Sequence, residues 1–171
     1  MSFDLCFMRL EPGETWQDAM ERLEEAAEEE RALDDDELAR WQAVRGSVQP
    51  LLAGAEEFSG ESFRELSHDA TGIQLRLSPG ELSLTVPYWY SGPDAQELVA
   101  RLRSVAAAVE HATGLTAYDP QADAPFLGAG EDTAAATFDQ VDAALRSPRS
   151  EPAAPPAGKT GGIRGLFRKR G

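Results

Sequence analysis

The sequence predicts an α+β domain of the ferredoxin-like, split β-α-β type, in which an antiparallel sheet carries its helices on one face. One observation behind this prediction is periodicity: segments whose apolar residues alternate, as in strands, are separated by segments with helical spacing. These segments follow the order strand, bent helix, two strands, helix, strand. That order is the one found in the ferredoxin-like arrangement.

Charge is the second observation, and it divides the chain in two. Residues 1–145 carry 9 arginines, no lysine and 29 acidic residues, for a net charge of −20. Residues 146–171 carry seven basic residues and one glutamate, for a net charge of +6, and are rich in Pro, Ala, Gly and Ser. Such a composition cannot bury a core. We therefore expect an acidic domain at 1–145, followed by a flexible linker and a disordered basic tail at 146–171.

The first strand is expected at residues 2–10, where the residues of SFDLCFMRL alternate between two faces. The stretch 14–54 has helical spacing, and Thr15 is placed to cap its start. The run DDD at 34–36 interrupts the apolar stripe, and aspartate favours helix caps over helix interiors. The stretch is therefore expected to form two helices that meet at these aspartates.

The alternating segments at 73–77 and 82–88 predict a β-hairpin, because the turn sequence Ser-Pro-Gly-Glu joins them. A short strand at 63–66 is expected before it. Pro87 conflicts with a central strand, since proline cannot donate a ladder hydrogen bond. We expect it to mark a bulge or the end of strand pairing.

Three further elements are expected towards the C-terminus. Residues 91–114 have the spacing and the terminal signals of an amphipathic helix. Residues 115–121 predict a last strand, and residues 131–145 predict a further short helix.

Composition limits the location of the protein. No apolar run reaches the ~20 residues that cross a bilayer, and the N-terminus lacks the basic region of a signal peptide. We therefore expect a cytoplasmic protein. Cys6, the single cysteine, agrees with that location because it can form no internal disulfide, and its place in a strand favours a buried, unreactive thiol.

The sequence contains no motif for catalysis, metal binding or cofactor binding. Two histidines and one cysteine give no zinc ligand set, and DDDE at 34–37 lacks the alternation and the glycine of a calcium loop. GKT at 158–160 lacks the first glycine, the strand and the helix of a phosphate-binding loop. We therefore expect no enzyme activity, no metal and no cofactor.

One enzymatic alternative stays open, in which His68, Asp119 and Tyr118 come together only in three dimensions. Asp119 precedes a proline, and by itself this pattern is typical of a turn.

Three consecutive aromatic residues, Tyr88, Trp89 and Tyr90, follow the second strand of the hairpin. Strand alternation places both tyrosines on the apolar face and Trp89 on the opposite face, beside Thr85. We therefore expect the tyrosines to complete the core with their hydroxyls at its rim. Trp89 is the candidate for surface chemistry, since a helix-free sheet face that bears a tryptophan is a candidate interaction surface.

Charged segments supply further candidate binding residues. The helix at 21–31 has more glutamates than its arginines can pair with, and an acidic face can steer a basic protein partner. The tail at 161–171 interleaves basic and apolar residues, which suits weak contact with an anionic membrane surface or nucleic acid, and it can equally fold back on the acidic domain. The candidate binding residues are Glu24, Glu25, Glu28, Glu29, Trp89, Tyr118, Arg168, Lys169 and Arg170.

The segments ELSHDATGIQLRL, LTVPYW and TGLTAYDPQ resemble those of a group of uncharacterised bacterial proteins of similar size. The shared features are an N-terminal M-S-[FY]-D-L, a TG[IL]Q hairpin, VPYW and a late YDPQ, and the resemblance covers residues 1–10 and 63–121. The group carries no established activity that the resemblance could transfer. Similar small acidic domains occur among immunity proteins of bacterial toxin systems, which is an association between domains and not a match of motifs.

Two functional hypotheses of different class follow. The first is a non-enzymatic protein-interaction domain, in one form an immunity-type inhibitor that binds a basic partner through the acidic helical face. The second is an accessory protein that docks through its basic tail on an anionic membrane surface or on nucleic acid.

Overall fold

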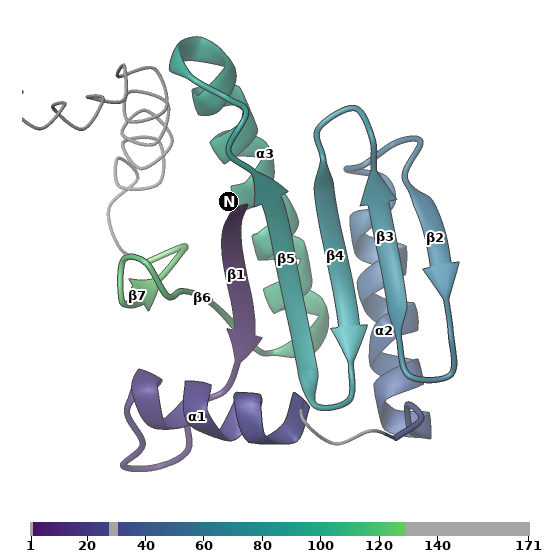
Figure 1. Ribbon diagram of the computed structural model, residues 1–171, viewed down its shortest axis with the longest axis vertical. Coiled ribbons are helices and arrows are strands. Elements are labelled where there is room, and N and C mark those ends of the chain that lie inside the picture. The colour runs from purple at the N-terminus through teal and green to yellow at the C-terminus, as the bar shows by residue number, and fades with distance from the viewer. Residues whose placement is uncertain (1, 28–30, 129–171) are drawn as a thin grey trace, which may run out of the picture.

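The computed structural model describes residues 2–27 and 31–128 (Figure 1). The helix expected at 131–145 and the tail expected at 146–171 lie outside the described residues, and so do Glu28, Glu29, Arg168, Lys169 and Arg170. Within the described ranges the chain forms one antiparallel sheet of seven strands, accompanied by three helices. The α+β class is therefore confirmed.

The strands lie side by side in the order β2-β3-β4-β5-β1-β6-β7. In chain order, the elements are β1 (Ser2–Met8), α1 (Trp16–Ala27), α2 (Asp35–Val48), β2 (Glu56–Ser59), β3 (Arg64–His68), β4 (Ile73–Ser78), β5 (Glu81–Pro87), α3 (Gly92–Thr113), β6 (Thr116–Asp119) and β7 (Ala124–Pro125).

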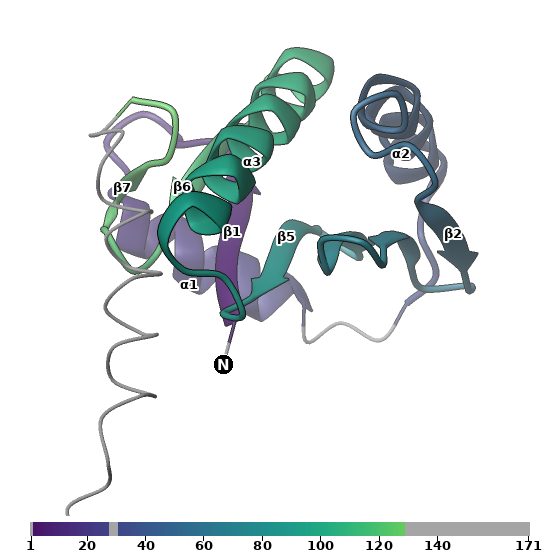
Figure 2. The same ribbon diagram turned by 90° about the horizontal axis from the view of Figure 1, so that it is seen from above.

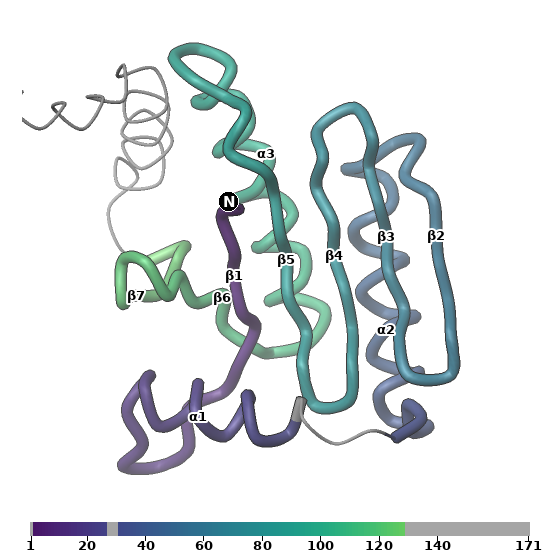
Figure 3. Tube along the Cα trace, in the orientation of Figure 1, coloured from purple at the N-terminus to yellow at the C-terminus, as the bar shows by residue number. Residues whose placement is uncertain are grey.

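The N-terminal strand β1 lies inside the sheet, between β5 and β6 (Figure 3). Leu5 of β1 is opposite Leu84 of β5. The expected hairpin consists of β4 and β5, and the register of these two strands confirms it. Pro87 is the last residue of β5 and is opposite Ser2, so it marks the end of strand pairing, one of the two expected roles.

One face of the sheet is covered by α2 and α3, as the view from above shows (Figure 2). Burying an apolar side chain of the size found here contributes about 1.5–3 kcal/mol, so this face holds most of the stabilising core. The buried side chains of this core include Phe3, Leu5, Phe7, Leu66, Ile73, Leu75, Leu77, Leu84 and Val86 of the sheet, Trp41, Val44 and Val48 of α2, and Leu102, Val105 and Val109 of α3.

Helix α1 packs on the opposite face, which corrects the expectation that all helices share one face. Cys6 and Met8 of β1 point to this side, and Ala19 and Leu23 of α1 cover them. The physical reason is that β1 is apolar on both faces towards its C-terminal end, so both faces need a cover. Figure 1 shows α1 crossing the lower end of the sheet.

Helix α2 begins at the aspartates 34–36, as expected, with Asp34 as its N-cap. Asp34 accepts a hydrogen bond from the backbone N–H of Glu37 at 2.8 Å, and the Glu37 carboxylate accepts one from the N–H of Asp34 at 2.9 Å. This reciprocal capping box satisfies donors that a helix start leaves unpaired. The cap role expected for the DDDE run is therefore confirmed.

The Glu37 carboxylate also joins three separate parts of the chain. It is 4% exposed, accepts two hydrogen bonds of 2.8 Å from the Arg31 guanidinium, and accepts a third of 2.8 Å from the N–H of Gly80 in the β4–β5 turn. The hydrogen bonds from Arg31, and then those from the two backbone N–H groups, lower the pKa of Glu37 to about 2.

The sequence does not predict β2 or β7. All four residues of β2, EEFS, are exposed, so they leave no apolar alternation to detect. Strand β7 has only two residues, too few for any periodic signal.

Replacing Glu37 with glutamine is expected to lower the free energy of unfolding by about 2 kcal/mol at pH 7, since it removes the charge that accepts hydrogen bonds from Arg31. The folded-state pKa of Glu37 lies below its ordinary value of 4.5, so the carboxylate stabilises the fold above pH 4.5 and loses this contribution as the pH falls towards 2. Urea unfolding should therefore show a smaller difference between the wild type and E37Q at pH 3 than at pH 7.

The matched control is Glu65→Gln, because Glu65 pairs with Arg76 at 3.2 Å in a more exposed position. Surface pairs of this kind contribute about 0–1 kcal/mol. Equal losses in the two variants, or a loss in E37Q that does not shrink at pH 3, would contradict the role given to Glu37.

Candidate interaction surface

Helix α1 covers only the lower end of one sheet face. The upper end of this face, around Ser2, carries polar side chains. Ser2 and Asp4 of β1, Gln74 of β4 and Thr85 of β5 alternate with core residues and therefore point to this face. Asp4 accepts hydrogen bonds from Ser2 Oγ at 2.9 Å and from Thr85 Oγ1 at 2.8 Å. We call this surface the open sheet face.

Trp89 stands at the edge of the open sheet face. The chain bends directly after Pro87, where the N–H of Trp89 donates a hydrogen bond of 3.0 Å to the Pro87 carbonyl. Trp89 is 79% exposed, whereas Tyr88 and Tyr90 are half-buried and pack against the main core. The predicted division of the three aromatic residues is therefore confirmed.

The Tyr88 ring and hydroxyl are both held in place. Its ring meets Phe3 edge to face, with ring centroids 6.5 Å apart, and its hydroxyl donates a hydrogen bond of 2.6 Å to Gln121 Oε1. Burial raises the pKa of the Tyr88 hydroxyl, so it stays protonated at neutral pH. Tyr88, the residue before Trp89, is thus anchored in the rim of the core.

A hollow of about 340 Å³ lies on the open sheet face beside Trp89. Gly72 in the β3–β4 turn has φ +65°, and a Cβ atom there would lie 2.8 Å from Pro87 Cγ and 3.6 Å from Trp89 Cζ3. The glycine therefore allows the turn to approach these two rings closely. The other residues that line the hollow are Ser2, Ser67, Asp69, Gln74 and Thr85.

The lining of this hollow suits a cationic side chain. An exposed indole ring attracts a guanidinium or ammonium group to its face. Asp69 contributes a carboxylate, and Gln74 and Thr85 contribute neutral hydrogen-bonding groups. Among the described residues that line the hollow, none is basic.

Glu24 and Glu25 lie on α1, which packs on the same face of the sheet as the hollow. Both side chains are exposed, and so are those of Asp18 and Glu21 on the same helix. Strand β1 runs from the hollow to α1 over seven residues, which corresponds to roughly 20 Å. A typical interface covers about 800 Å² on each partner, enough to include both features.

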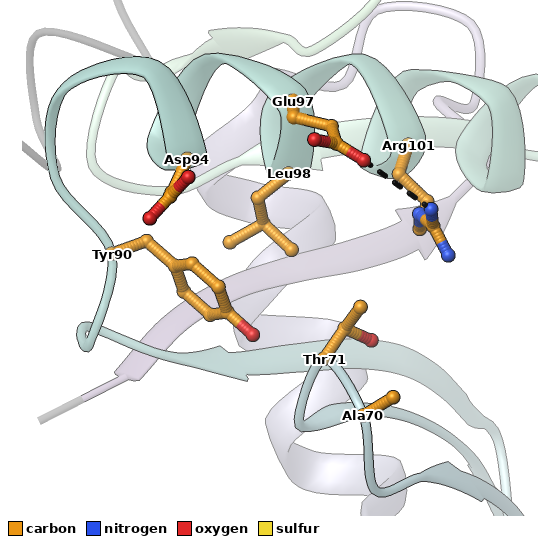
Figure 4. A pocket seen from close by; sticks show the side chains of 7 residues that line it. All are labelled: Ala70, Thr71, Tyr90, Asp94, Glu97, Leu98 and Arg101. Carbon is orange, nitrogen blue, oxygen red and sulfur yellow. Dashed lines mark ion pairs between the residues drawn. The ribbon is translucent and has the colours of Figure 1, made fainter.

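A second hollow, of about 280 Å³, lies between the β3–β4 turn and the first turns of α3 (Figure 4). Tyr90, Asp94 and Thr71 line it, and Glu97 pairs with Arg101 at 3.7 Å along its edge. Its lining carries two carboxylates and one guanidinium, and one of these carboxylates is paired with that guanidinium.

The three residues of the enzymatic alternative do not form one site. His68 is on β3, whereas Tyr118 and Asp119 are on β6, and β4, β5 and β1 lie between these strands. Four strand spacings of ~4.8 Å correspond to roughly 19 Å. Tyr118 and Asp119 are also neighbours on one strand and therefore point to opposite faces.

Each of these three side chains has a structural partner instead. His68 is buried, with Nδ1 2.7 Å from Thr71 Oγ1. Asp119 Oδ1 accepts hydrogen bonds from the N–H groups of Gln121 at 2.8 Å and Ala122 at 3.2 Å, and burial raises the pKa of its carboxyl. The turn role expected for Asp119 is thus confirmed.

Tyr118, a candidate binding residue, is only 3% exposed and lies under α1. Its ring stacks on Trp16 with centroids 5.1 Å apart, and its hydroxyl donates a hydrogen bond to Asp123. Burial and this bond raise the pKa of Tyr118 to about 12. The structure therefore places Tyr118 in the interior, away from any surface that a partner can reach.

The same cluster contains Cys6. Burial, followed by the nearby carboxylates of Glu81 and Asp4, raises the pKa of the Cys6 thiol to about 11. The thiol is therefore protonated at neutral pH, and the expectation of a buried, unreactive cysteine is confirmed.

Within residues 2–27 and 31–128, no group of three or more His, Cys, Asp or Glu side chains is placed to hold a metal ion. The helices in these ranges include none that is both long and apolar enough to span a bilayer. No protein-family model, no curated protein and no solved structure matches the chain.

Of the candidate binding residues that the structure describes, Trp89 lines the hollow, Glu24 and Glu25 are exposed on α1, which packs on the same side of the sheet, and Tyr118 is buried. Sequence reasoning missed Asp69 and Gly72, which line the hollow from the β3–β4 turn. Strand alternation predicts that Trp89 and Thr85 lie on the same face of the sheet, and both line the hollow. The contribution of Gly72 carries no such signal, because it depends on how closely the turn approaches Pro87.

Replacing Gly72 with alanine is expected to lower the free energy of unfolding by about 2 kcal/mol. The new Cβ would collide with the Pro87 ring, and an L-residue at φ +65° is strained in addition. Urea unfolding measures the loss, and acrylamide quenching of tryptophan fluorescence reports whether Trp89 has moved.

Gly46→Ala provides a control of opposite sign, since Gly46 lies within α2 and has open space around the added Cβ. There the change should stabilise by about 1 kcal/mol, because alanine is the better helix former. If G72A were as stable as the wild type, the close approach described at Gly72 would be wrong.

Proposed function

We propose that the protein is a non-enzymatic, cytoplasmic protein-interaction domain that binds a basic protein partner through the open sheet face. The observation that carries the proposal is the position of Trp89. A side chain of this size that is 79% exposed and lies beside a hollow leaves apolar area that a partner can bury.

Charge supports the choice of partner. Residues 1–145 carry 29 acidic residues against 9 arginines, and Glu24 and Glu25 are exposed on α1, which packs on the side of the sheet that bears Trp89. Complementary charge accelerates association and excludes partners of like charge. An immunity-type inhibitor, which would cover the functional surface of a basic toxin, is one form of this function.

We also propose that the fold is a ferredoxin-like core with additions. The strands β4, β5, β1 and β6 are adjacent in that order, α2 lies between β1 and β4 in the chain, and α3 lies between β5 and β6. This connectivity agrees with a split β-α-β arrangement. In that interpretation β2, β3, β7 and α1 are extensions. The resemblance to a group of bacterial proteins stays a prediction.

The alternative function, docking through the basic tail, depends on Arg168, Lys169 and Arg170, which lie outside the described residues. The described residues provide no observation that favours it over the open sheet face.

Truncating Trp89 to alanine is expected to weaken partner binding by roughly thirtyfold, because a tryptophan buried at the centre of an interface typically contributes about 2 kcal/mol or more. Affinity capture from native lysate with wild-type and W89A baits measures the effect. A basic protein held by the wild type should be depleted from the W89A capture.

Phe58→Ala is the matched control, since Phe58 is an exposed aromatic residue on the edge strand β2 and is 47% exposed. The F58A bait should hold the same protein as the wild type. Equal capture by W89A and wild type would remove the observation on which the proposal rests.

Reversing charge on α1 tests the acidic contribution separately. Glu24→Lys combined with Glu25→Lys is expected to slow association with the captured partner by about tenfold at low salt, with a smaller effect at high salt, because electrostatic steering is screened. Stopped-flow or surface-based kinetics with the captured partner measures the rate.

A double variant with Glu56→Lys and Glu61→Lys carries the same change in net charge at exposed positions near the other edge of the sheet. An identical slowing in both double variants would show that net charge alone controls the rate, and would remove α1 from the interface.

A further inference from the structure

The arginines of this acidic protein differ in whether their guanidinium groups form hydrogen bonds or ion pairs. Nine arginines lie in the described part of the chain. Arg64 donates to backbone carbonyls, and Arg103 also interacts with a neighbour. Five pair with glutamates at 2.8–3.7 Å, namely Arg22, Arg31, Arg45, Arg76 and Arg101.

The remaining two are Arg9 and Arg40. Among the described residues, none forms a hydrogen bond or an ion pair with the guanidinium group of either arginine. Residues 1–145 hold about three acidic side chains for every arginine, so an arginine without a carboxylate is not the expected outcome. Arg9 follows β1, whereas Arg40 lies on α2, so the two are far apart in the sequence.

Both of these arginines line the same cavity. It has a volume of about 260 Å³ and lies where the chain segments after β1 and after α3, the helices α1 and α2, and the β4–β5 turn meet. Arg22 of α1 lines it as well. The other lining residues are apolar or neutral, and no carboxylate belongs to the described lining. The cavity is at the end of β1 opposite to the Trp89 hollow.

The supporting groups around the cavity are already fixed. The Arg22 guanidinium is bonded to Glu14 and donates a hydrogen bond of 2.9 Å to the backbone carbonyl of Arg9, which holds the chain at that point. Thr113 Oγ1 donates to the Val109 carbonyl and accepts from the N–H of Leu115. The hydroxyl is therefore occupied, and the donors left for a ligand are the guanidinium groups of Arg9 and Arg40.

We propose that this cavity is a binding site for a small multivalent oxyanion, with Arg9 and Arg40 as its charged ligands. The planar fork of a guanidinium matches the paired oxygens of phosphate and carboxylate groups. The volume is below the usual range of ~300–1,000 Å³ for drug-sized ligands, which favours an anion of the size of pyrophosphate or citrate. This site is independent of the proposed protein interface.

Isothermal titration calorimetry of the full chain with pyrophosphate, and in a separate arm with citrate, tests the proposal. The wild type should bind at least one of the two saturably with one site per chain, and the arm that binds identifies phosphate or carboxylate chemistry. Arg9→Gln and Arg40→Gln should each weaken binding by at least about tenfold, which corresponds to about 1.4 kcal/mol.

Arg101→Gln is the matched control, since Arg101 lies outside this cavity and already pairs with Glu97. It should bind the anion as the wild type does. Thermal unfolding without ligand checks that R9Q and R40Q fold, and Arg40→Lys, which keeps the charge but not the fork, should bind with intermediate affinity. If the binding heat of the anion were the same in R9Q, R40Q and the wild type, the anion would bind elsewhere, for example at the basic tail, and the proposal would be overturned. The proposal would also be overturned if neither pyrophosphate nor citrate bound the wild type saturably.

Discussion

One face of β1 is apolar throughout, whereas the other changes from polar to apolar along the strand. This change determines where the three helices pack. Phe3, Leu5 and Phe7 give one face an apolar row from end to end, whereas the other face changes from Ser2 and Asp4 to Cys6 and Met8. Because strand side chains alternate strictly, neither row can be buried without its own cover. Helices α2 and α3 cover the continuous row, and α1 covers only the apolar half of the other.

This arrangement gives the two ends of one sheet face different chemistry. At the Cys6 end, α1 buries its apolar side against the sheet and presents carboxylates outward. At the Ser2 end, Asp4 and Thr85 satisfy each other, and the bend after Pro87 projects Trp89 beside a hollow. The surface that we propose for partner binding is therefore a direct result of the position of α1, which covers only the lower end of this face (Figure 1). The arginine-lined cavity lies at the opposite end of β1, where residues of α1, α2 and the segment after β1 line it together.

Local sequence signals predicted much of this fold. The hairpin, the helix cap at the aspartates 34–36, the outward position of Trp89 and the buried Cys6 all depend on residues close together in the chain. What the sequence could not predict depends on tertiary choices. An amphipathic helix can pack on either face of a sheet. Strand β2 is exposed throughout, so its sequence has no apolar periodicity. Whether Arg9 and Arg40 have a carboxylate partner is determined by segments that are far apart in the sequence.

The central claim is that a protein partner contacts the open sheet face at Trp89. The most direct test places a photoreactive phenylalanine analogue at position 89 in cells, with the same substitution at position 58 as a reference site on the sheet edge. One basic protein should cross-link from position 89 and not from position 58. No cross-linked protein at position 89, or the same set of proteins from both positions, would contradict it.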